Sequence, residues 1–208
     1  ATFTEMSQSV GLTGAVGATR DAAFADFDDD GRMDLVVVGE KGARLYRNAG
    51  NRQFTDATAA SGIDVSGGAA VAVGDYDNNG TFDLFIAGRN GMSPTLWLND
   101  GNGKFRRDAR SDDVLKPLAT IDARAVVFTD FDNDGWLDLI VGGDGSVRVL
   151  RNDGTGRFVD RSSILPPTAS SATSIVAADV DADGDQDLLL GGPTGVRLLR
   201  NLGANGSL

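Results

Sequence analysis

Short apolar runs recur along the whole chain, and Gly, Asp and Asn cluster between them. Runs of this length with turn residues on both sides predict β-strands. Four of these apolar runs lead directly into an acidic loop. These four runs are Ala22–Phe27, Val71–Tyr76, Ala125–Phe131 and Ser174–Val180. The pattern predicts an all-β protein.

The four acidic loops share one pattern. Each has Asp at positions 1, 3 and 9, Asp or Asn at position 5, and Gly at position 6. The first Asp recurs at intervals of 49, 55 and 49 residues, and an apolar run follows each loop. Further along come an Asn (Asn48, Asn99, Asn152 and Asn201) and, six residues later, an aromatic residue (Phe54, Phe105 and Phe158). One repeat of about fifty residues therefore covers the chain.

Each repeat predicts four short strands, which is the size of one blade of a β-propeller. The predicted fold is therefore an all-β, four-bladed β-propeller of four antiparallel strands per blade, with residues 1–208 in a single domain. The predicted blades cover about residues 20–58, 69–109 and 123–162, and a last blade combines 173–208 with 1–7.

The two ends of the chain complement one another in this repeat. The fourth aromatic position falls at Ser207, whereas Phe3-Thr4-Glu5 matches Phe54-Thr55-Asp56. The chain thus begins with the outer strand that its last repeat lacks. We expect residues Thr2–Ser7 to pair with the C-terminal blade and to close the ring.

The loops carry the ligands that Ca²⁺ prefers, which are six to eight hard oxygen atoms. Positions 1, 3, 5 and 9 offer side-chain oxygens, position 7 offers a backbone carbonyl, and the Gly permits a sharp bend. Clustered carboxylates repel one another without a cation. Mg²⁺ fits less well, because it requires octahedral geometry and retains water. We predict about four Ca²⁺ ions, one per repeat, with these ligands: Asp26, Asp28, Asp30, Arg32, Asp34, Asp75, Asp77, Asn79, Thr81, Asp83, Asp130, Asp132, Asp134, Trp136, Asp138, Asp179, Asp181, Asp183, Asp185 and Asp187.

The loop Asp-x-Asp-x-[Asp/Asn]-Gly-x-x-Asp-Leu, followed by Leu-Tyr-Arg-Asn and Phe-Thr-Asp, resembles the FG-GAP/VCBS repeat of integrin α propellers and of bacterial secreted proteins. The resemblance covers essentially the whole chain and is closer to the bacterial VCBS-type branch. It implies a calcium-binding propeller, extracellular or periplasmic, whose calcium loops lie opposite the usual ligand-binding loops. Integrin-like propellers have seven blades, so four repeats leave open a complete, monomeric four-bladed ring, a dimer that completes a larger ring, or an excised fragment. The matching ends of the chain favour the first.

Composition excludes several classes of protein. The net charge of −11 argues against nucleic-acid binding. The chain has no His and no Cys, which excludes His-based catalysis and thiol chemistry, and no apolar run has transmembrane length. The carboxylates that remain for glycoside hydrolysis are Asp21, Asp56, Asp64, Asp112, Asp113, Asp122 and Asp144. Because nearly all of them fall in predicted loops, we predict no catalytic site and no cofactor besides Ca²⁺.

The function predicted from the sequence is a non-catalytic extracellular scaffold or protein-interaction module with structural Ca²⁺. A lectin-like carbohydrate-binding propeller and a fragment of a polysaccharide-active enzyme are the alternatives. The predicted partner is an unidentified protein or carbohydrate, with no nucleic acid and no membrane insertion.

Overall fold

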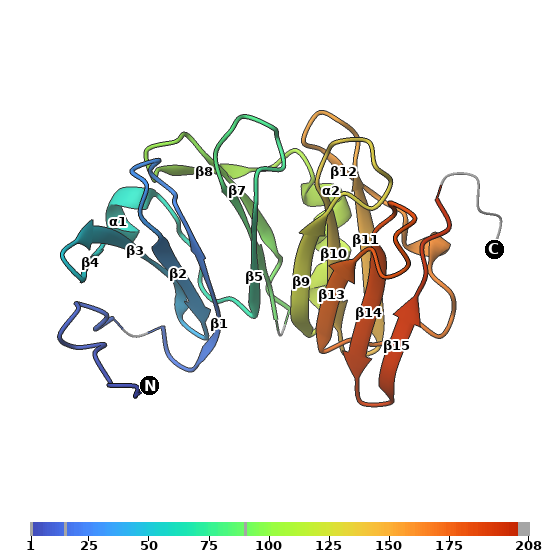
Figure 1. Ribbon diagram of the computed structural model, residues 1–208, viewed down its shortest axis with the longest axis horizontal. Helices are drawn as coiled ribbons and strands as arrows, with labels where there is room; N and C mark the ends of the chain where they lie inside the picture. The colour runs from blue at the N-terminus through green and yellow to red at the C-terminus, as the bar shows by residue number, and fades with distance from the viewer. Residues whose placement is uncertain (1, 15, 90, 204–208) are drawn as a thin grey trace.

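The computed structural model describes residues 2–14, 16–89 and 91–203, and four antiparallel sheets follow one another through them (Figure 1). Within each sheet the strands lie in chain order. The sheets are β1 (Thr19–Ala25), β2 (Asp34–Gly39), β3 (Gly42–Gly50) and β4 (Gln53–Asp56); β5 (Ala70–Gly74), β6 (Asp83–Ala87), β7 (Thr95–Asn99) and β8 (Phe105–Asp108); β9 (Ala123–Thr129), β10 (Asp138–Gly143), β11 (Ser146–Asn152) and β12 (Phe158–Asp160); and β13 (Ser174–Ala178), β14 (Asp187–Gly192) and β15 (Gly195–Leu199). The all-β prediction is confirmed.

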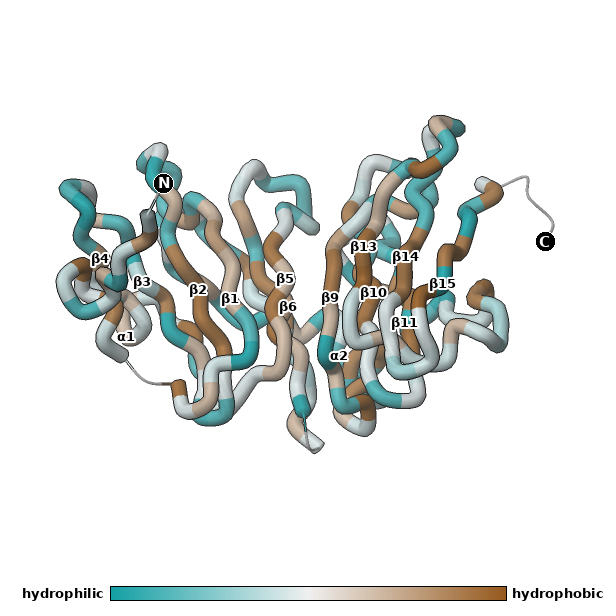
Figure 2. Tube along the Cα trace, turned by 60° about the horizontal axis from the view of Figure 1, so that its bottom comes forward, coloured by the Kyte–Doolittle hydropathy of each residue, from teal (hydrophilic) through white to brown (hydrophobic). Residues whose placement is uncertain are grey.

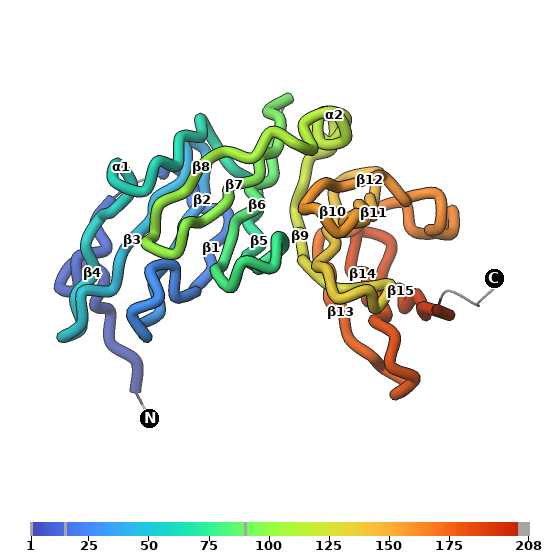
Figure 3. Tube along the Cα trace, turned by 90° about the horizontal axis from the view of Figure 1, so that it is seen from above, coloured from blue at the N-terminus to red at the C-terminus, as the bar shows by residue number. Residues whose placement is uncertain are grey.

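The first strands of successive sheets lie side by side, β1 next to β5, β5 next to β9, and β9 next to β13. Figure 3 shows the sheets along an open arc, with the first and last sheets at its two ends. Short helices occur in the connections between sheets: α1 (Thr58–Ser61), α2 (Asp112–Leu115), η1 (Lys116–Thr120) and η2 (Ser162–Ile164). Among the described residues, no helix combines the length and the apolar character needed to span a membrane.

The apolar core lies between adjacent sheets. Val36 of the first sheet and Leu84 of the second are fully buried in one cluster, and equivalent clusters join the second sheet to the third and the third to the fourth. Figure 2 shows hydrophobic positions along the strands and hydrophilic positions in the loops. Each buried aliphatic side chain contributes about 1.5–3 kcal/mol, so most of the stability comes from contacts between neighbouring sheets.

The predicted closure of the ring is not confirmed, and residues Thr2–Ser7 do not pair with the last sheet as predicted. The fourth sheet has three strands within the described residues, residues 2–7 form no strand, and Phe3 is fully exposed. The backbone N–H of Phe54 donates to the carbonyl of Val10 at 2.7 Å, which holds the N-terminal segment on the first sheet. That sheet lies at the far end of the arc from β15. Residues 1 and 204–208, including Ser207, lie outside the described residues.

Candidate metal centres

All four acidic loops have the same backbone conformation. The carboxylate at position 1 accepts hydrogen bonds from the N–H groups of positions 5 and 6; for Asp26 these distances are 3.0 Å from Asp30 and 2.7 Å from Gly31. The residue at position 4 and the glycine at position 6 both have positive φ, 56° at Asp29 and 82° at Gly31. Glycine, Asn and Asp tolerate this conformation best. The sequence prediction missed position 4, although Asn or Asp occupies it in three of the loops: Asp29, Asn78 and Asn133, with Ala182 in the fourth.

The aspartate at position 9 joins the loop to the sheet. In Asp138, which is fully buried, Oδ1 accepts the N–H of Asn152 at 2.7 Å and Oδ2 accepts the N–H of Phe131 at 3.1 Å. Asp34, Asp83 and Asp187 make the same two bonds in their own sheets. One carboxylate therefore connects the start of the loop with the end of the third strand.

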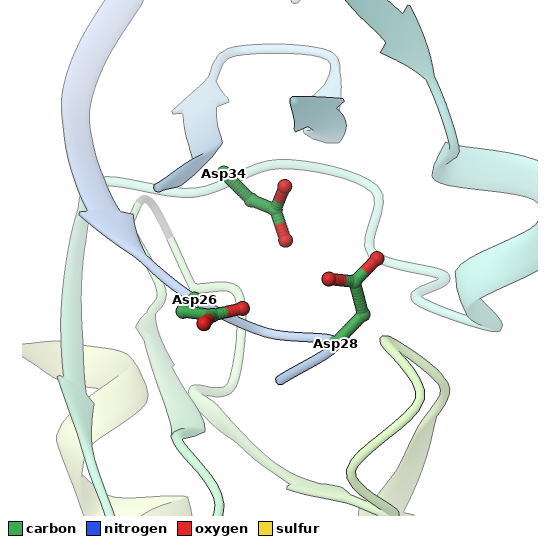
Figure 4. A group of neighbouring side chains, drawn as sticks. All are labelled: Asp26, Asp28 and Asp34. Atoms are coloured by element: carbon green, nitrogen blue, oxygen red, sulfur yellow. The ribbon is translucent and has the colours of Figure 1, made fainter. Parts of the chain in front are cut away.

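Positions 1, 3 and 9 form a compact triad in every loop. In each triad one carboxylate oxygen from each of the three residues lies within 4.8 Å of the other two. Figure 4 shows the side chains of Asp26, Asp28 and Asp34 facing a common space. The triads are Asp26, Asp28 and Asp34; Asp75, Asp77 and Asp83; Asp130, Asp132 and Asp138; and Asp179, Asp181 and Asp187. Each triad could hold a metal ion.

The oxygens at position 3 supply a test of that fit. The Oδ1 atoms of Asp28, Asp77 and Asp132 are buried and have no hydrogen-bond donor among the described residues. A buried charged oxygen without a partner is costly, by about 1–3 kcal/mol or more. A cation beside positions 1 and 9 would remove that cost, so the donor set fits a hard divalent ion.

Position 5 faces an arginine in three of the loops. The Nη2 atom of Arg47 lies 3.3 Å from the carboxylate of Asp30. The same contact joins Arg151 to Asp134 at 2.6 Å. Arg200 and Asp183 repeat the pair at 3.0 Å in the fourth loop. The second sheet has Leu98 in place of the arginine and Asn79 in place of the aspartate. In the second repeat both members of this ion pair are replaced by neutral residues. The summed charge of the triad, position 5 and the arginine position is therefore the same in all four repeats.

The sequence prediction also included positions 5 and 7 as ligands. The structure places position 5 beside the triad, where its side-chain oxygen accepts the N–H of position 7; the distance is 3.0 Å from Arg32 to Asp30 and 2.8 Å from Thr81 to Asn79. Trp136 and Asp185 at position 7 make the same bond. Coordination by these two positions stays a prediction.

Burial raises the pKa of the position-9 carboxyl in the first three loops. Desolvation raises the pKa of Asp83 to about 7, although the N–H groups of Asn99 and Tyr76 oppose this shift. Desolvation likewise raises the pKa of Asp138 to about 7, and the nearby Asp132 and Asp134 add to the shift. Burial also raises the pKa of Asp34. Without a cation, the second and third loops therefore each hold a carboxyl with a pKa of about 7.

The asparagine anchor of each repeat links neighbouring sheets. The Nδ2 atom of Asn99 donates to the carbonyl of Phe27 at 2.8 Å, and Asn152 donates to Tyr76 at 2.7 Å. Asn201 donates to the carbonyl of Phe131 at 2.6 Å. We call this bond the asparagine bridge; it runs from the asparagine of one sheet to position 2 in the acidic loop of the preceding sheet. The sequence repeat marked these asparagines but not their role, because each acceptor lies at least seventy residues away in the chain.

Several carboxylates outside the loops have structural partners. Arg124 lies 3.2 Å from Asp122 and 2.8 Å from Asp144. Asp56 forms an ion pair with an arginine of the neighbouring strand, and Asp21 accepts the N–H of Val71 in the next sheet. The absence of a catalytic site stays a prediction.

Comparison with known proteins supports the repeat. A 110-residue segment is 32% identical to cartilage acidic protein 1 of Mus musculus, covering 51% of this chain and 17% of the relative. The Xenopus tropicalis protein of the same name is 27% identical over 141 residues, covering 66% of this chain and 21% of the relative. The chain therefore spans about a fifth of the length of these curated relatives.

Solved structures show the same fold at lower identity. A lectin of Agrocybe aegerita that recognises non-reducing terminal N-acetylglucosamine superposes with a TM-score of 0.59 and 22% identity, over 86% of this chain and 48% of the lectin. A Tc holotoxin pore of Photorhabdus luminescens superposes with a TM-score of 0.50 and 23% identity, over 85% of this chain and 9% of that chain. These likenesses support a β-propeller-like arrangement of the sheets.

The model of the FG-GAP-like repeat matches residues 26–86, 76–141 and 130–190, so three overlapping matches cover most of the chain and all four acidic loops. The chain belongs to the family of FG-GAP-like repeat proteins.

Proposed function

We propose that this chain is a non-catalytic, calcium-binding interaction module in which Ca²⁺ stabilises the loops between the first and second strands of each sheet. The observation that carries the proposal is that the buried Oδ1 atoms of Asp28, Asp77 and Asp132 have no hydrogen-bond donor among the described residues and lie beside two further carboxylates. The other oxygen of Asp28 and of Asp132 pairs with an arginine. Ca²⁺ accepts irregular cages of protein oxygens, whereas Mg²⁺ prefers octahedral geometry and its own water.

The position of the loops supports a structural role for the ion. Position 2 of each of the first three loops accepts an asparagine bridge, and position 9 is bonded to the backbone of the third strand. A cation that fixes the loop therefore also fixes the contact with the next sheet. The result is a rigid scaffold on which other loops can be presented to a protein partner.

We also propose an extracellular or periplasmic location. Calcium sites of extracellular modules bind with dissociation constants of about 10⁻⁴–10⁻³ M, which suits the calcium concentration outside cells. Exposed Asp-rich loops such as Asp179–Asp187 fit this range, because part of their ligand charge is solvated.

Calorimetric titration tests the proposal. The chain is expected to bind about four Ca²⁺ per molecule, one in each triad. Asp77→Asn should remove one site, because it neutralises a buried ligand in the second loop. The matched control is Asp64→Asn, an exposed aspartate between α1 and β5, which should keep all sites. Unchanged stoichiometry in Asp77→Asn, or no heat of binding in the unmodified chain, would contradict the proposal.

Calcium stabilisation is expected to grow as the pH rises. In the metal-free loops the pKa of Asp83 and Asp138 is about 7, far above the value of 3.8 for a free side chain. Their contribution to metal-free stability is therefore complete below about pH 4 and is lost as the pH rises through about 7. Calcium requires the ionised form, so its apparent affinity for these two loops should be about tenfold or more weaker near pH 5.5 than near pH 8. Melting curves with and without calcium at both pH values measure this difference; an equal gain at both would refute the assignment.

Carbohydrate binding is the second candidate function. Its support is the fold shared with the Agrocybe aegerita lectin, which recognises terminal N-acetylglucosamine. A glycan array that includes this sugar separates the two functions, because saturable binding to one glycan class would favour the carbohydrate-binding function. Turnover on a panel of polysaccharides would instead favour the third alternative, a fragment of an enzyme.

A further inference from the structure

The exposed face of the fourth sheet repeats a face that is buried in the preceding sheets. Leu189 and Leu198 are 40% and 54% exposed, whereas their counterparts Phe85 and Leu96 in the second sheet are fully buried. Val180, at position 2 of the last loop, is 54% exposed, and its counterpart Tyr76 is fully buried. The last sheet therefore presents the same surface that elsewhere receives a following sheet.

A pocket in the fourth sheet lies where the other three sheets have their outer strand. In the second sheet, the outer-strand residue Phe105 packs edge-on against Phe27 with ring centroids 5.6 Å apart. The same cluster contains Val36, Leu45, Leu84 and Trp97. Phe27, Val36, Leu45, Leu84 and Trp97 have equivalents in the third and fourth sheets, and these equivalents line a pocket of about 530 Å³. In the same order they are Phe131, Ile140, Val149, Leu188 and Leu199. The pocket therefore lies where an aromatic residue of a fourth strand would pack.

The N-terminal segment carries the matching strand. Phe3-Thr4-Glu5 repeats Phe54-Thr55-Asp56, and Phe3 is fully exposed. Gly11, eight residues after Phe3, lies against the carbonyl of Phe54. In the same way Gly62, eight residues after Phe54, lies against the carbonyl of Phe105. Residues 8–14 thus already occupy the position of a linker that follows an outer strand of a preceding sheet.

Hydrogen bonds and charges at the two ends are complementary. The Nδ2 group of Asn48 donates to the carbonyl of Met33 in its own loop, as the other anchors do, and no acidic loop among the described residues accepts an asparagine bridge from Asn48. Val180 would supply that carbonyl. In the third sheet, Arg148 lies 3.8 Å from Asp160 across the outer strands. The corresponding residues are Arg197 in β15 and Glu5 in the N-terminal segment.

We propose that two copies of this chain join head to tail, the first sheet of each packing on the exposed face of the fourth sheet of the other. Residues 3–7 of each copy form the fourth outer strand in the last sheet of its partner, and Phe3 enters the pocket beside Phe131. The interface continues the three that already exist within the chain. Two such contacts related by a twofold axis close one ring without unpaired ends.

Light scattering in calcium tests the assembly. We expect twice the chain mass of 21.6 kDa. Leu198→Asp places a charge on the proposed interface and should halve the measured mass. The matched control Val159→Asp alters a similarly exposed residue, 43% accessible, on the outer strand of the third sheet, and should leave the dimer intact. A monomer in the unmodified chain would overturn the proposal, and so would a series of larger open oligomers.

A disulfide identifies the origin of the strand. Tyr46 pairs with Asp56 and Leu150 pairs with Asp160 in register, so Leu199 should pair with Glu5. The chain has no cysteine, and a Glu5→Cys, Leu199→Cys double variant therefore contains only the designed pair. Under mild oxidation we expect covalent dimers on a non-reducing gel, while each single variant stays uncrosslinked. A crosslink within one chain would show closure by its own N-terminus and would overturn the proposal, as would the absence of any crosslink.

Discussion

Removal of calcium with EDTA is expected to lower the melting temperature of this protein by about 20 °C or more. A ligand that binds only the folded state stabilises it by about 2.7 kcal/mol when its concentration is a hundredfold above its dissociation constant. Four triads would together contribute about 11 kcal/mol under that condition. A domain of this size gains about 2–4 °C for each kcal/mol.

The control for chelation is the return of calcium. Excess Ca²⁺ added to the EDTA-treated protein should restore the original melting curve, and the same excess of Mg²⁺ should restore much less of it, because these cages are built from protein oxygens. A melting temperature that EDTA leaves within about 2 °C of the starting value would exclude structural metal at the four loops.

Asp138→Ala is expected to cause the largest loss among single substitutions. The fully buried carboxylate accepts two backbone N–H groups, from Asn152 and Phe131, and truncation leaves both without an acceptor. Each orphaned donor costs about 1–3 kcal/mol, so the free energy of unfolding should fall by about 2–6 kcal/mol even in EDTA. Loss of one calcium site should add about 2–3 kcal/mol in its presence.

Urea unfolding with and without calcium separates the two contributions of Asp138. The control Asp64→Ala alters an exposed aspartate and should change the free energy of unfolding by less than about 0.5 kcal/mol. An Asp138→Ala chain with unfolding indistinguishable from that of the control in both buffers would show that position 9 neither binds an ion nor supports the loop.

The sequence predicted the loops well because their chemistry is local. The spacing from Asp26 to Asp34 determines which carboxylates meet, and the structure brings positions 1, 3 and 9 together in every repeat. The strands that lead into the loops were also placed to within a few residues; the predicted run Val71–Tyr76 overlaps β5, Ala70–Gly74. Alternating apolar and turn residues specify such elements without reference to the rest of the chain.

Features that depend on the angle between sheets could not be predicted in the same way. Four repeats and a matching N-terminal segment suggested a closed ring, whereas the described sheets follow an open arc. The rotation between sheets depends on side-chain packing across them, which the repeat pattern does not specify. The pairing of Arg47 with Asp30 was missed as well, although the joint change to Leu98 and Asn79 in the second repeat was a visible signal. The acceptor of each asparagine bridge required the three-dimensional arrangement.

The asparagine bridge makes the array cooperative from one neighbour to the next. Asn152 receives its position from Asp138 of its own loop and donates to the loop of the sheet before it, at Tyr76. An ion that ordered one loop would therefore also order the acceptor, and indirectly the carboxylate triad, of an adjacent loop. In a one-dimensional array of this kind, stability depends on nearest-neighbour coupling, and terminal units are the first to fray. If the loops bind ions as proposed, the affinity of each loop would depend on its place in the row as well as on its own ligands.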